Sequence, residues 1–340
     1  MTGSTTSDTF WKQRLGAGSL DTAEALAFAE FVLNRVSRTF ALNIRVLPRP
    51  LRDQVLYAYL YCRMADTIED DAALPVHEKA RLLHAFAALF DPNRAPAEAE
   101  AAFEAFPDLL PEVWRGSGDW EKILLERAPV VLRAFPAFPA PARAAIARCV
   151  TEMCGGMADF AAKKKIETVT ELDEYCYYVA GTVGVMLCDL YIDYAKIPPE
   201  RAEKMRALCV SFGLGLQLTN ILTDVRDDGE RGVSWIPAGM NYSQVLNKAH
   251  RHLEEALEYS CLIPRLQRRL RLFCLWPLFM AAETLALLAV SGGTRVKITR
   301  ARVARILLRT RLTYPFNSLL RAEFRAATAA LPIPLPPDTF

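Results

Sequence analysis

The chain has 340 residues, of which 52% are hydrophobic, so it is long enough to bury a sizeable core. Its formal net charge is +2, and this near-neutral balance argues against nucleic acid as a partner. The eight cysteines show no C-x-x-C spacing and lie mostly in apolar stretches, a pattern typical of reduced, buried thiols in a cytoplasmic protein.

The N-terminal segment is polar and lacks the basic stretch and apolar core of a signal peptide, so we expect residues 1–18 to form a flexible tail. Asp21 followed by Glu24 is a capping-box pattern, which predicts the start of a long helix that runs towards Arg45. From there on, prolines break the chain at intervals, while alternating strand patterns are lacking. The sequence therefore predicts an all-α fold.

The first chemical motif is an acidic stripe on a predicted apolar helix. Asp66 and Asp70 are four residues apart, which places both carboxylates on one helical face, and Tyr59 and Arg63 continue this face. Glu69 lies beside the pair. Like charges at this spacing repel and weaken a helix, so they call for a compensating cation. Because the surrounding residues are mostly apolar, this helix is expected to be buried on several sides, where an unpaired charge is costly.

A second stripe repeats the pattern further along the chain, with Gln217, Asn220, Asp224 and Asp228 at steps of three and four. Oxygen ligands of this kind suit magnesium, which keeps several waters and is commonly held by a few carboxylates together with substrate phosphates. The two stripes therefore predict a magnesium diphosphate ligand that is held from two sides. For either stripe alone, the alternative is a solvated helix face, since acids at this spacing are common on surfaces.

The most apolar stretch is Leu272–Val290, but Pro277 and Glu283 interrupt it. It predicts a buried helix that lines a pocket, and no transmembrane helix. Basic and apolar residues then alternate over Arg295–Arg311, which predicts either peripheral contact with anionic lipid or a solvated helix. We expect a cytoplasmic monomer that touches a membrane at most at its periphery.

Five motifs occur in a characteristic order between Ser37 and Arg302. They are Ser37-Arg38-Thr39-Phe40, Tyr59 to Asp71, Gly156-Met157-Ala158-Asp159-Phe160, Tyr175 to Gly181, and Gln217 to Asp228. In this order they resemble the squalene and phytoene synthase family. Two further segments, Phe273-Cys274-x-x-Pro277 and Val296-Lys297-Ile298-Thr299-Arg300, are more similar to squalene synthases than to phytoene synthases.

The resemblance implies a single-domain isoprenoid synthase fold, with helices around a central cavity, over residues 19–328. A proline-rich tail is expected over residues 329–340. The implied activity is the head-to-head condensation of two farnesyl diphosphates through presqualene diphosphate, followed by NADPH-dependent reduction to squalene. Such an enzyme would serve isoprenoid biosynthesis on the way to sterols or hopanoids.

The resemblance also implies roles for single residues. Asp66, Asp70, Asp224 and Asp228 would ionise the substrate through Mg²⁺, with Glu69 and Asn220 as further metal ligands. Tyr175 would transfer the proton that is lost when the cyclopropane ring closes. The implied substrate-binding residues are Ser37, Arg38, Phe40, Tyr59, Arg63, Gln217, Asn220 and Arg231.

The sequence predicts no Rossmann site for the expected reductant NADPH, because no G-x-G-x-x-G fingerprint follows a predicted strand. The implied contacts for NADPH are Lys297 and Arg300, with Asn220 near the reacting centre. For Lys297 and Arg300 the alternative is an ordinary basic helix face.

The chain also departs from the family pattern. Thr223 stands where many members have an arginine. In the flap that follows, Glu230-Arg231-Gly232-Val233-Ser234-Trp235, the basic residue is shifted to Arg231. Three alternatives therefore stay open. One is a non-reducing relative that makes presqualene diphosphate, dehydrosqualene or phytoene. The second is a terpene cyclase, although the pair Asp224 and Asp228 favours coupling. The third is a non-catalytic assembly factor, which would not need repelling acids on a buried face.

Overall fold

The computed structural model describes residues 3–163, 165–230, 232, 234–291 and 296–331. Within these ranges, the side chains of residues 3–6, Arg38 and Asp228 lie outside the description. The chain divides into two compact units, which we call unit 1 (residues 1–45 and 49–154) and unit 2 (residues 46–48 and 155–340).

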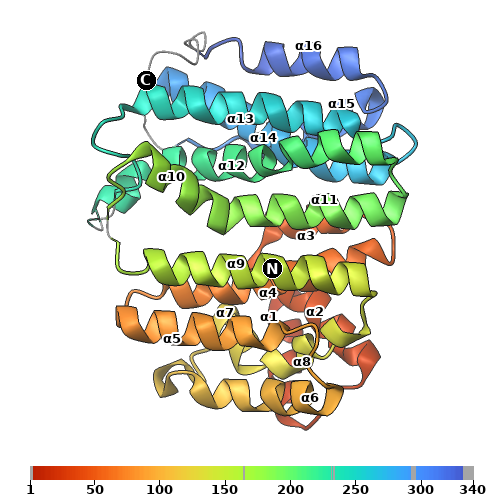
Figure 1. Ribbon diagram of the computed structural model, residues 1–340, viewed down its shortest axis with the longest axis vertical. Helices are drawn as coiled ribbons and strands as arrows, with labels where there is room; N and C mark the ends of the chain where they lie inside the picture. Colours follow the sequence, from red (N-terminus) through yellow and green to blue (C-terminus); the bar gives the residue numbers. More distant parts are fainter. Residues whose placement is uncertain (1–2, 164, 231, 233, 292–295, 332–340) are drawn as a thin grey trace. The chain divides into compact units, whose positions relative to one another are not determined.

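Unit 1 consists of helices and short helical turns (Figure 1). Its helices are α1 (Gly3–Gly16), α2 (Thr22–Val36), α3 (Arg38–Ile44), α4 (Leu51–Asp70), α5 (Val76–Ala87), α6 (Pro96–Ala105), α7 (Trp120–Glu126), α8 (Ala128–Leu132) and the first part of α9 (Ala140–Phe160). Single turns connect them: η1 (Ala88–Phe90), η2 (Phe106–Leu109), η3 (Glu112–Trp114) and η4 (Phe135–Ala137).

The N-terminal segment is a helix, so the expected flexible tail over residues 1–18 is wrong where α1 forms. Trp11 and Leu15 on this helix are buried. The Trp11 ring centroid lies 5.5 Å from that of Phe28 on α2. Burial of this apolar surface fixes the segment, although its sequence is polar overall.

The capping box is confirmed, because the Asp21 side chain accepts the N–H of Glu24 and the Glu24 carboxylate accepts the N–H of Asp21. The helix that it starts is shorter than predicted. Extended backbone at Ser37 (φ −160°, ψ 111°) ends α2, and the Ser37 hydroxyl accepts the N–H of Phe40 at 3.3 Å to start α3. Ser37 therefore turns the chain so that Phe40 sits on a separate helix, at a serine cap.

Helix α4 runs through the core of unit 1 and packs against α2, α5 and α7. Its side chains between positions 59 and 70 are buried, apart from the predicted stripe and Glu69. Tyr61, fully buried, donates its hydroxyl to the carbonyl of Val131 at 2.9 Å. The expectation that this helix is buried on several sides is confirmed.

Unit 2 contains the remainder of the chain. Its elements are the end of α9, α10 (Val169–Cys176), the π-helical turn η5 (Tyr177–Gly181), α11 (Thr182–Ala195), α12 (Pro199–Glu230), α13 (Tyr242–Leu262), α14 (Arg268–Ser291), α15 (Arg300–Thr313) and α16 (Asn317–Ala327). The β pairing within the described ranges is a single parallel bridge between Lys165 and Ser234. The all-α prediction is therefore confirmed.

Helices α11, α12 and α13 lie side by side in unit 2 (Figure 1). Glycines make this packing close: a Cβ atom at Gly184 would overlap the carbonyl oxygen of Cys209, and one at Gly213 would overlap that of Ala180. Side chains at these two positions would push α12 away from α11 and the π turn.

Three helical stretches of unit 2 are long and apolar enough to cross a membrane, judged by length and composition alone. They are Val169–Ala195, Pro199–Asp227 and Arg268–Ser291. In each, more than half of the apolar window is buried inside the protein. The expectation that the chain has no transmembrane helix stays a prediction.

Candidate active site

The acidic stripe of α4 is its accessible side: Tyr59, Arg63 and Asp66 are half-buried, and Asp70 is exposed. Arg63 forms an ion pair with Glu121 on α7, and one of its nitrogens lies 3.7 Å from an Asp66 carboxylate oxygen. The ring of Tyr59 lies 5.1 Å from that of Phe40, centroid to centroid. Unit 1 thus brings together an aromatic pair, a guanidinium and the acids, as the helical spacing predicts.

Burial makes the charged form of these acids costly. It raises the pKa of Asp66 to about 7, an effect that Arg63 opposes and Asp70 reinforces. Burial and the neighbouring Asp70 likewise raise the pKa of Glu69 to about 8. The Lys79 ammonium donates to the backbone carbonyl of Glu69. A divalent cation would relieve this accumulation of carboxylates directly.

Asp71, the next acid along the chain, has a different environment. Its carboxylate accepts the N–H of Ala73 at 2.8 Å and lies 3.1 Å from the ammonium of Lys122. Although burial opposes them, these partners lower the pKa of Asp71. Asp71 therefore caps the end of α4 and joins it to α7, a structural role that helical spacing alone does not separate from the stripe.

The donor set of α4 fits a hard cation, because carboxylate oxygens on one face are the ligands that magnesium prefers. Across the described residues, three or more His, Cys, Asp or Glu side chains do not converge on one point. This suits an ion that keeps most of its waters and shares its coordination with substrate phosphates. Metal binding by Asp66, Glu69 and Asp70 stays a prediction.

The second stripe lies near the C-terminal end of α12 in unit 2. Asn220 is exposed, while Gln217 and Asp224 are half-buried. The side chain of Asp228 and the whole of Arg231 fall outside the described residues, as does the side chain of Arg38 in unit 1. The ligand roles predicted for them stay predictions.

Thr223 stands where the resemblance implies an arginine, and its side chain bonds back onto α12. Its hydroxyl donates to the carbonyl of Thr219 one turn earlier, at 2.8 Å. The position therefore offers no cation to a bound phosphate.

Tyr175 is buried between aromatic rings in unit 2. It stacks on Trp235 with 4.1 Å between centroids and 11° between planes, and its centroid lies 5.7 Å from that of Phe160. The segment that carries Trp235 is tied down by a hydrogen bond from the N–H of Ile166 to the carbonyl of Ser234, 2.9 Å long. The flap thus places an aromatic face directly on the predicted proton-transfer residue.

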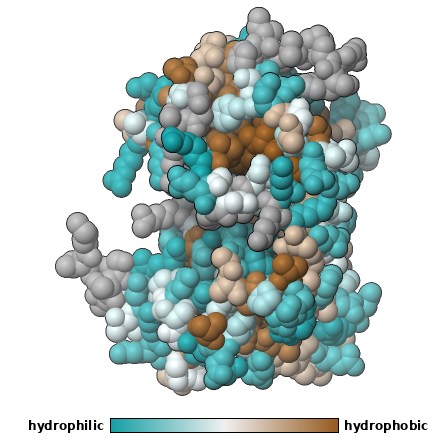
Figure 2. Space-filling view, turned by 90° about the vertical axis from the view of Figure 1, so that its left-hand side faces the viewer, coloured by the Kyte–Doolittle hydropathy of each residue, from teal (hydrophilic) through white to brown (hydrophobic). Residues whose placement is uncertain are grey.

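The helix changes its winding immediately after Tyr175. The π turn η5 holds Tyr178, whose ring lies so close to Gly156 that a Cβ atom there would overlap it. π turns inside helices are frequent at functional sites, because they re-aim side chains. In unit 2, at the level of α10 to α12, Figure 2 shows apolar side chains gathered in a hollow with polar ones around it.

The residues predicted to bind NADPH lie at the start of α15. Lys297 and Arg300 are exposed, and within the described parts of the chain no ion pair involves either of them. Thr299 caps the helix by accepting the N–H of Arg302 at 3.2 Å. Two unpaired cations beside a helix N-terminus fit an anionic phosphate group.

Two residues that contact the site, Glu121 and Trp235, were not predicted from the sequence. Glu121 pairs with Arg63 from 58 positions away, and no local spacing relates them. Trp235 lies in the flap after α12, but its stacking on Tyr175 is a contact between segments 60 positions apart. The signal in the sequence that could have indicated Trp235 is that it is an aromatic residue in a flap of otherwise mostly small and charged residues.

Comparisons with known proteins show what the sequence and the fold are similar to. The sequence pattern of the family described as squalene/phytoene synthase matches residues 33–244. Squalene synthase 1 of Arabidopsis thaliana is 30% identical over an alignment of 338 residues, which covers 87% of this chain and 75% of that protein. Lycopaoctaene synthase of Botryococcus braunii is 32% identical over 204 residues, which are 60% of this chain and only 42% of that relative. A solved structure described as TcSQS with the ligand BPH1237 has a TM-score of 0.70 and 27% identity, and the match covers 91% of this chain and 98% of that one.

Proposed function

The chain belongs to the squalene/phytoene synthase family, and we propose that it joins two farnesyl diphosphates head to head. The product of this first reaction would be presqualene diphosphate, and NADPH-dependent reduction would convert it to squalene. The observation that carries the proposal is the pair of acidic stripes, one on the largely buried helix α4 and the other next to the buried stretch of α12 that ends at Leu222. The relatives named squalene synthase support the choice of substrate and product.

The acidic stripes would hold the diphosphate groups through magnesium, which supplies Lewis-acid neutralisation of the departing diphosphate. Asp66, Glu69 and Asp70 would bind the metal on α4, and Asn220, Asp224 and Asp228 would do so on α12. Arg63 has the fork-like donors that suit phosphate oxygens, and its ion pair with Glu121 holds it in place meanwhile.

Loss of diphosphate leaves an allylic cation, which must be kept from water until a carbon–carbon bond forms. The aromatic cluster of Phe160, Tyr175 and Trp235 offers π faces that stabilise positive charge in a dry environment. Closing the cyclopropane ring releases a proton. Tyr175 would assist the loss of this proton, as the resemblance implies.

The reductive step would use NADPH, which supplies the hydride that ends the second rearrangement. Lys297 and Arg300 would hold its phosphates at the start of α15. A chain that lacked this step would release presqualene diphosphate or dehydrosqualene instead. Because squalene is insoluble in water, peripheral contact with a membrane is part of the proposal.

Product analysis tests the proposal. The purified chain is incubated with farnesyl diphosphate and magnesium, with and without NADPH, and the products are identified by mass spectrometry. Squalene that forms only with NADPH would support both half-reactions. Presqualene diphosphate or dehydrosqualene in both incubations would restrict the function to the first half-reaction, and the absence of any product would refute the proposed condensation.

A further inference from the structure

Helix α15 and the turn that follows it expose a row of large apolar side chains. Leu308 is 60% exposed and Leu312, one turn later on the same face, is 68% exposed. Phe316 in the turn to α16 is 53% exposed, and Leu319 in the first turn of α16 is 47% exposed. Four large apolar side chains within twelve residues are an unusual surface for a water-soluble protein.

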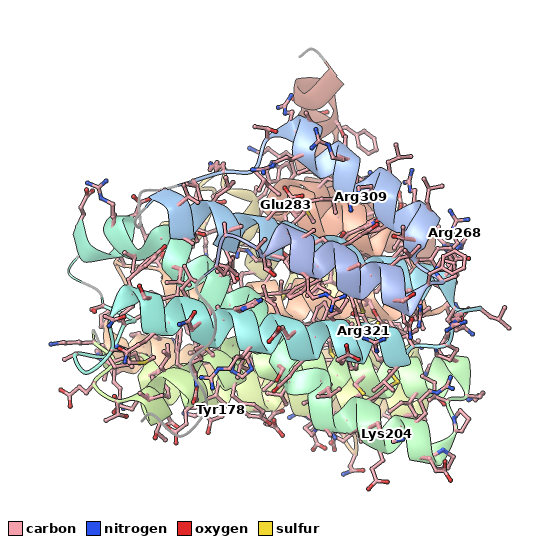
Figure 3. The ribbon with its side chains drawn as sticks, turned by 90° about the horizontal axis from the view of Figure 1, so that it is seen from above. Tyr178, Lys204, Arg268, Glu283, Arg309 and Arg321 are labelled. Atoms are coloured by element: carbon pink, nitrogen blue, oxygen red, sulfur yellow. The ribbon has the colours of Figure 1, made fainter. Side chains whose placement is uncertain are left out.

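The packing of α15 in unit 2 leaves this apolar row facing the solvent. Ile306 and Thr310 on the opposite face of α15 are buried, and the Thr310 hydroxyl accepts the indole N–H of Trp276 on α14 at 3.1 Å. The apolar row is therefore not needed to hold the helix in place. Figure 3 looks onto the side of unit 2 that carries α15 and α16, where Arg309 and Arg321 are labelled.

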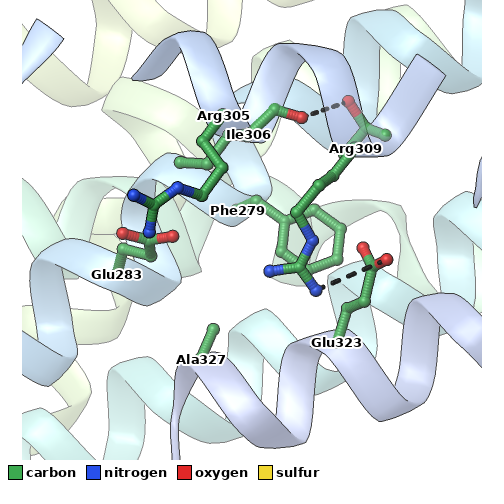
Figure 4. Close-up of a pocket in the computed structure, with 8 residues that line it drawn as sticks. Phe279, Glu283, Arg305, Ile306, Arg309, Glu323 and Ala327 are labelled. Carbon is green, nitrogen blue, oxygen red and sulfur yellow. Dashed lines mark hydrogen bonds and ion pairs between the residues drawn. The ribbon is translucent and has the colours of Figure 1, made fainter. Parts of the chain in front are cut away.

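The same helix is strongly basic. It contains five arginines and no acidic residue: Arg300, Arg302, Arg305, Arg309 and Arg311. Two of them form ion pairs with acids on neighbouring helices. Arg302 lies 2.9 Å from Glu283 on α14, and Arg309 lies 3.5 Å from Glu323 on α16 (Figure 4).

Arg305 and Arg311 are exposed on either side of Leu308 and have no ion pair within the described part of the chain. Arg311 lies over the Trp276 ring, 5.5 Å from its centroid, so its charge is held near the surface. Among the described residues, five arginines on α15 face only two acids of neighbouring helices, so a net positive charge remains beside the exposed leucines. A partner for this surface must combine apolar depth with negative charge.

We propose that α15 and the α15–α16 turn form a docking surface for an anionic lipid bilayer. Leu308, Leu312 and Phe316 enter the boundary between headgroups and acyl chains, while Arg305 and Arg311 bind lipid phosphates. The purpose of this contact rests on the proposed function, since a hydrocarbon product needs an apolar phase to leave the enzyme. The contact itself requires no substrate.

Vesicle sedimentation of the full chain tests the proposal. One vesicle preparation contains phosphatidylcholine alone, and the other adds about one third of phosphatidylglycerol. We expect binding to the anionic vesicles, weaker binding at high salt as charges are screened, and little binding to neutral ones. Equal binding to both kinds of vesicle, or to neither, would overturn the proposal, whatever product the enzyme makes from farnesyl diphosphate.

Two double variants locate the surface. L308S/L312S should weaken binding to anionic vesicles about tenfold or more, because the two leucines that it removes supply apolar contact area with the lipid. The matched control L109S/V113S changes two exposed apolar residues, also four apart, in unit 1, and should bind like the parent chain.

If the two double variants bound alike, the surface assignment would be wrong. Gel filtration distinguishes self-association: a dimer that L308S/L312S abolished would show that a second copy, and not lipid, covers this row. R305Q/R311Q should lower binding at low salt and make the remaining binding less sensitive to salt.

Discussion

At the scale of residues, neighbouring acids at one helix end have different environments. Asp71 has a lysine and a backbone N–H as partners, so its charge is compensated within the fold. Asp66 and Glu69 instead have raised pKa values, because burial and the nearby Asp70 carboxylate disfavour their charged forms. The contrast identifies which acids are available to a ligand.

The contrast leads to a paired prediction. Asp66→Asn should keep the fold and lower magnesium-dependent turnover of farnesyl diphosphate about 100-fold or more, since a metal ligand is lost. Asp71→Asn should retain most turnover but lower the free energy of unfolding by about 1–2 kcal/mol, because its capping and ion-pair contacts weaken. Turnover assays and urea unfolding measure the two effects. Near-full activity in Asp66→Asn would contradict the metal assignment.

A second prediction concerns the stacked pair. Trp235→Ala should lower kcat about tenfold with a smaller effect on KM, because Tyr175 loses the face that holds it and keeps water away. Trp235→Phe retains an aromatic face and serves as the control, with most of the activity kept. If both variants matched the parent in steady-state kinetics, the stacking would have no part in the reaction.

At the scale of elements, one buried arginine joins the ends of two helices. Arg271 on α14 is 1% exposed and donates to the carbonyls of Cys261, Ile263 and Tyr314 at distances of 2.6–2.8 Å. These carbonyls belong to the C-terminal ends of α13 and α15, where the helix dipole is negative. Burial lowers the pKa of Arg271, so its charge depends on these carbonyl partners.

Arg271→Met should therefore lower the free energy of unfolding by about 2–4 kcal/mol, because several buried carbonyls lose their donor. The neighbouring exposed Arg269 is the matched control, and Arg269→Met should change stability by no more than about 0.5 kcal/mol. Urea unfolding followed by circular dichroism measures both. Equal stability of the two variants would show that the Arg271 contacts contribute little.

At the scale of the whole molecule, the chain forms two compact helical units, with the first acidic stripe in unit 1 and the second in unit 2. The prediction of one catalytic domain over residues 19–328 stays a prediction. Tyr175 and the proposed NADPH contacts both lie in unit 2, on α10 and at the start of α15.

The two proposed half-reactions should be separable by mutation. Lys297→Ala with Arg300→Ala should leave formation of presqualene diphosphate nearly unchanged and make it accumulate, because only the NADPH phosphates lose contacts. Mass spectrometry of products formed with NADPH measures the ratio of presqualene diphosphate to squalene. A parallel loss of both half-reactions would show that these residues serve something other than the cofactor.

The sequence by itself determined the features that depend on local periodicity. The all-α class, the exposure pattern of α4 and the capping box follow from spacing along one helix, and the family follows from the order of five motifs. Tertiary structure decided which side chains from distant segments of the sequence come into contact. Glu121 beside Arg63, Trp235 on Tyr175 and Phe28 against the helical N-terminus are packing contacts, and packing depends on three-dimensional fit between elements that no local spacing encodes.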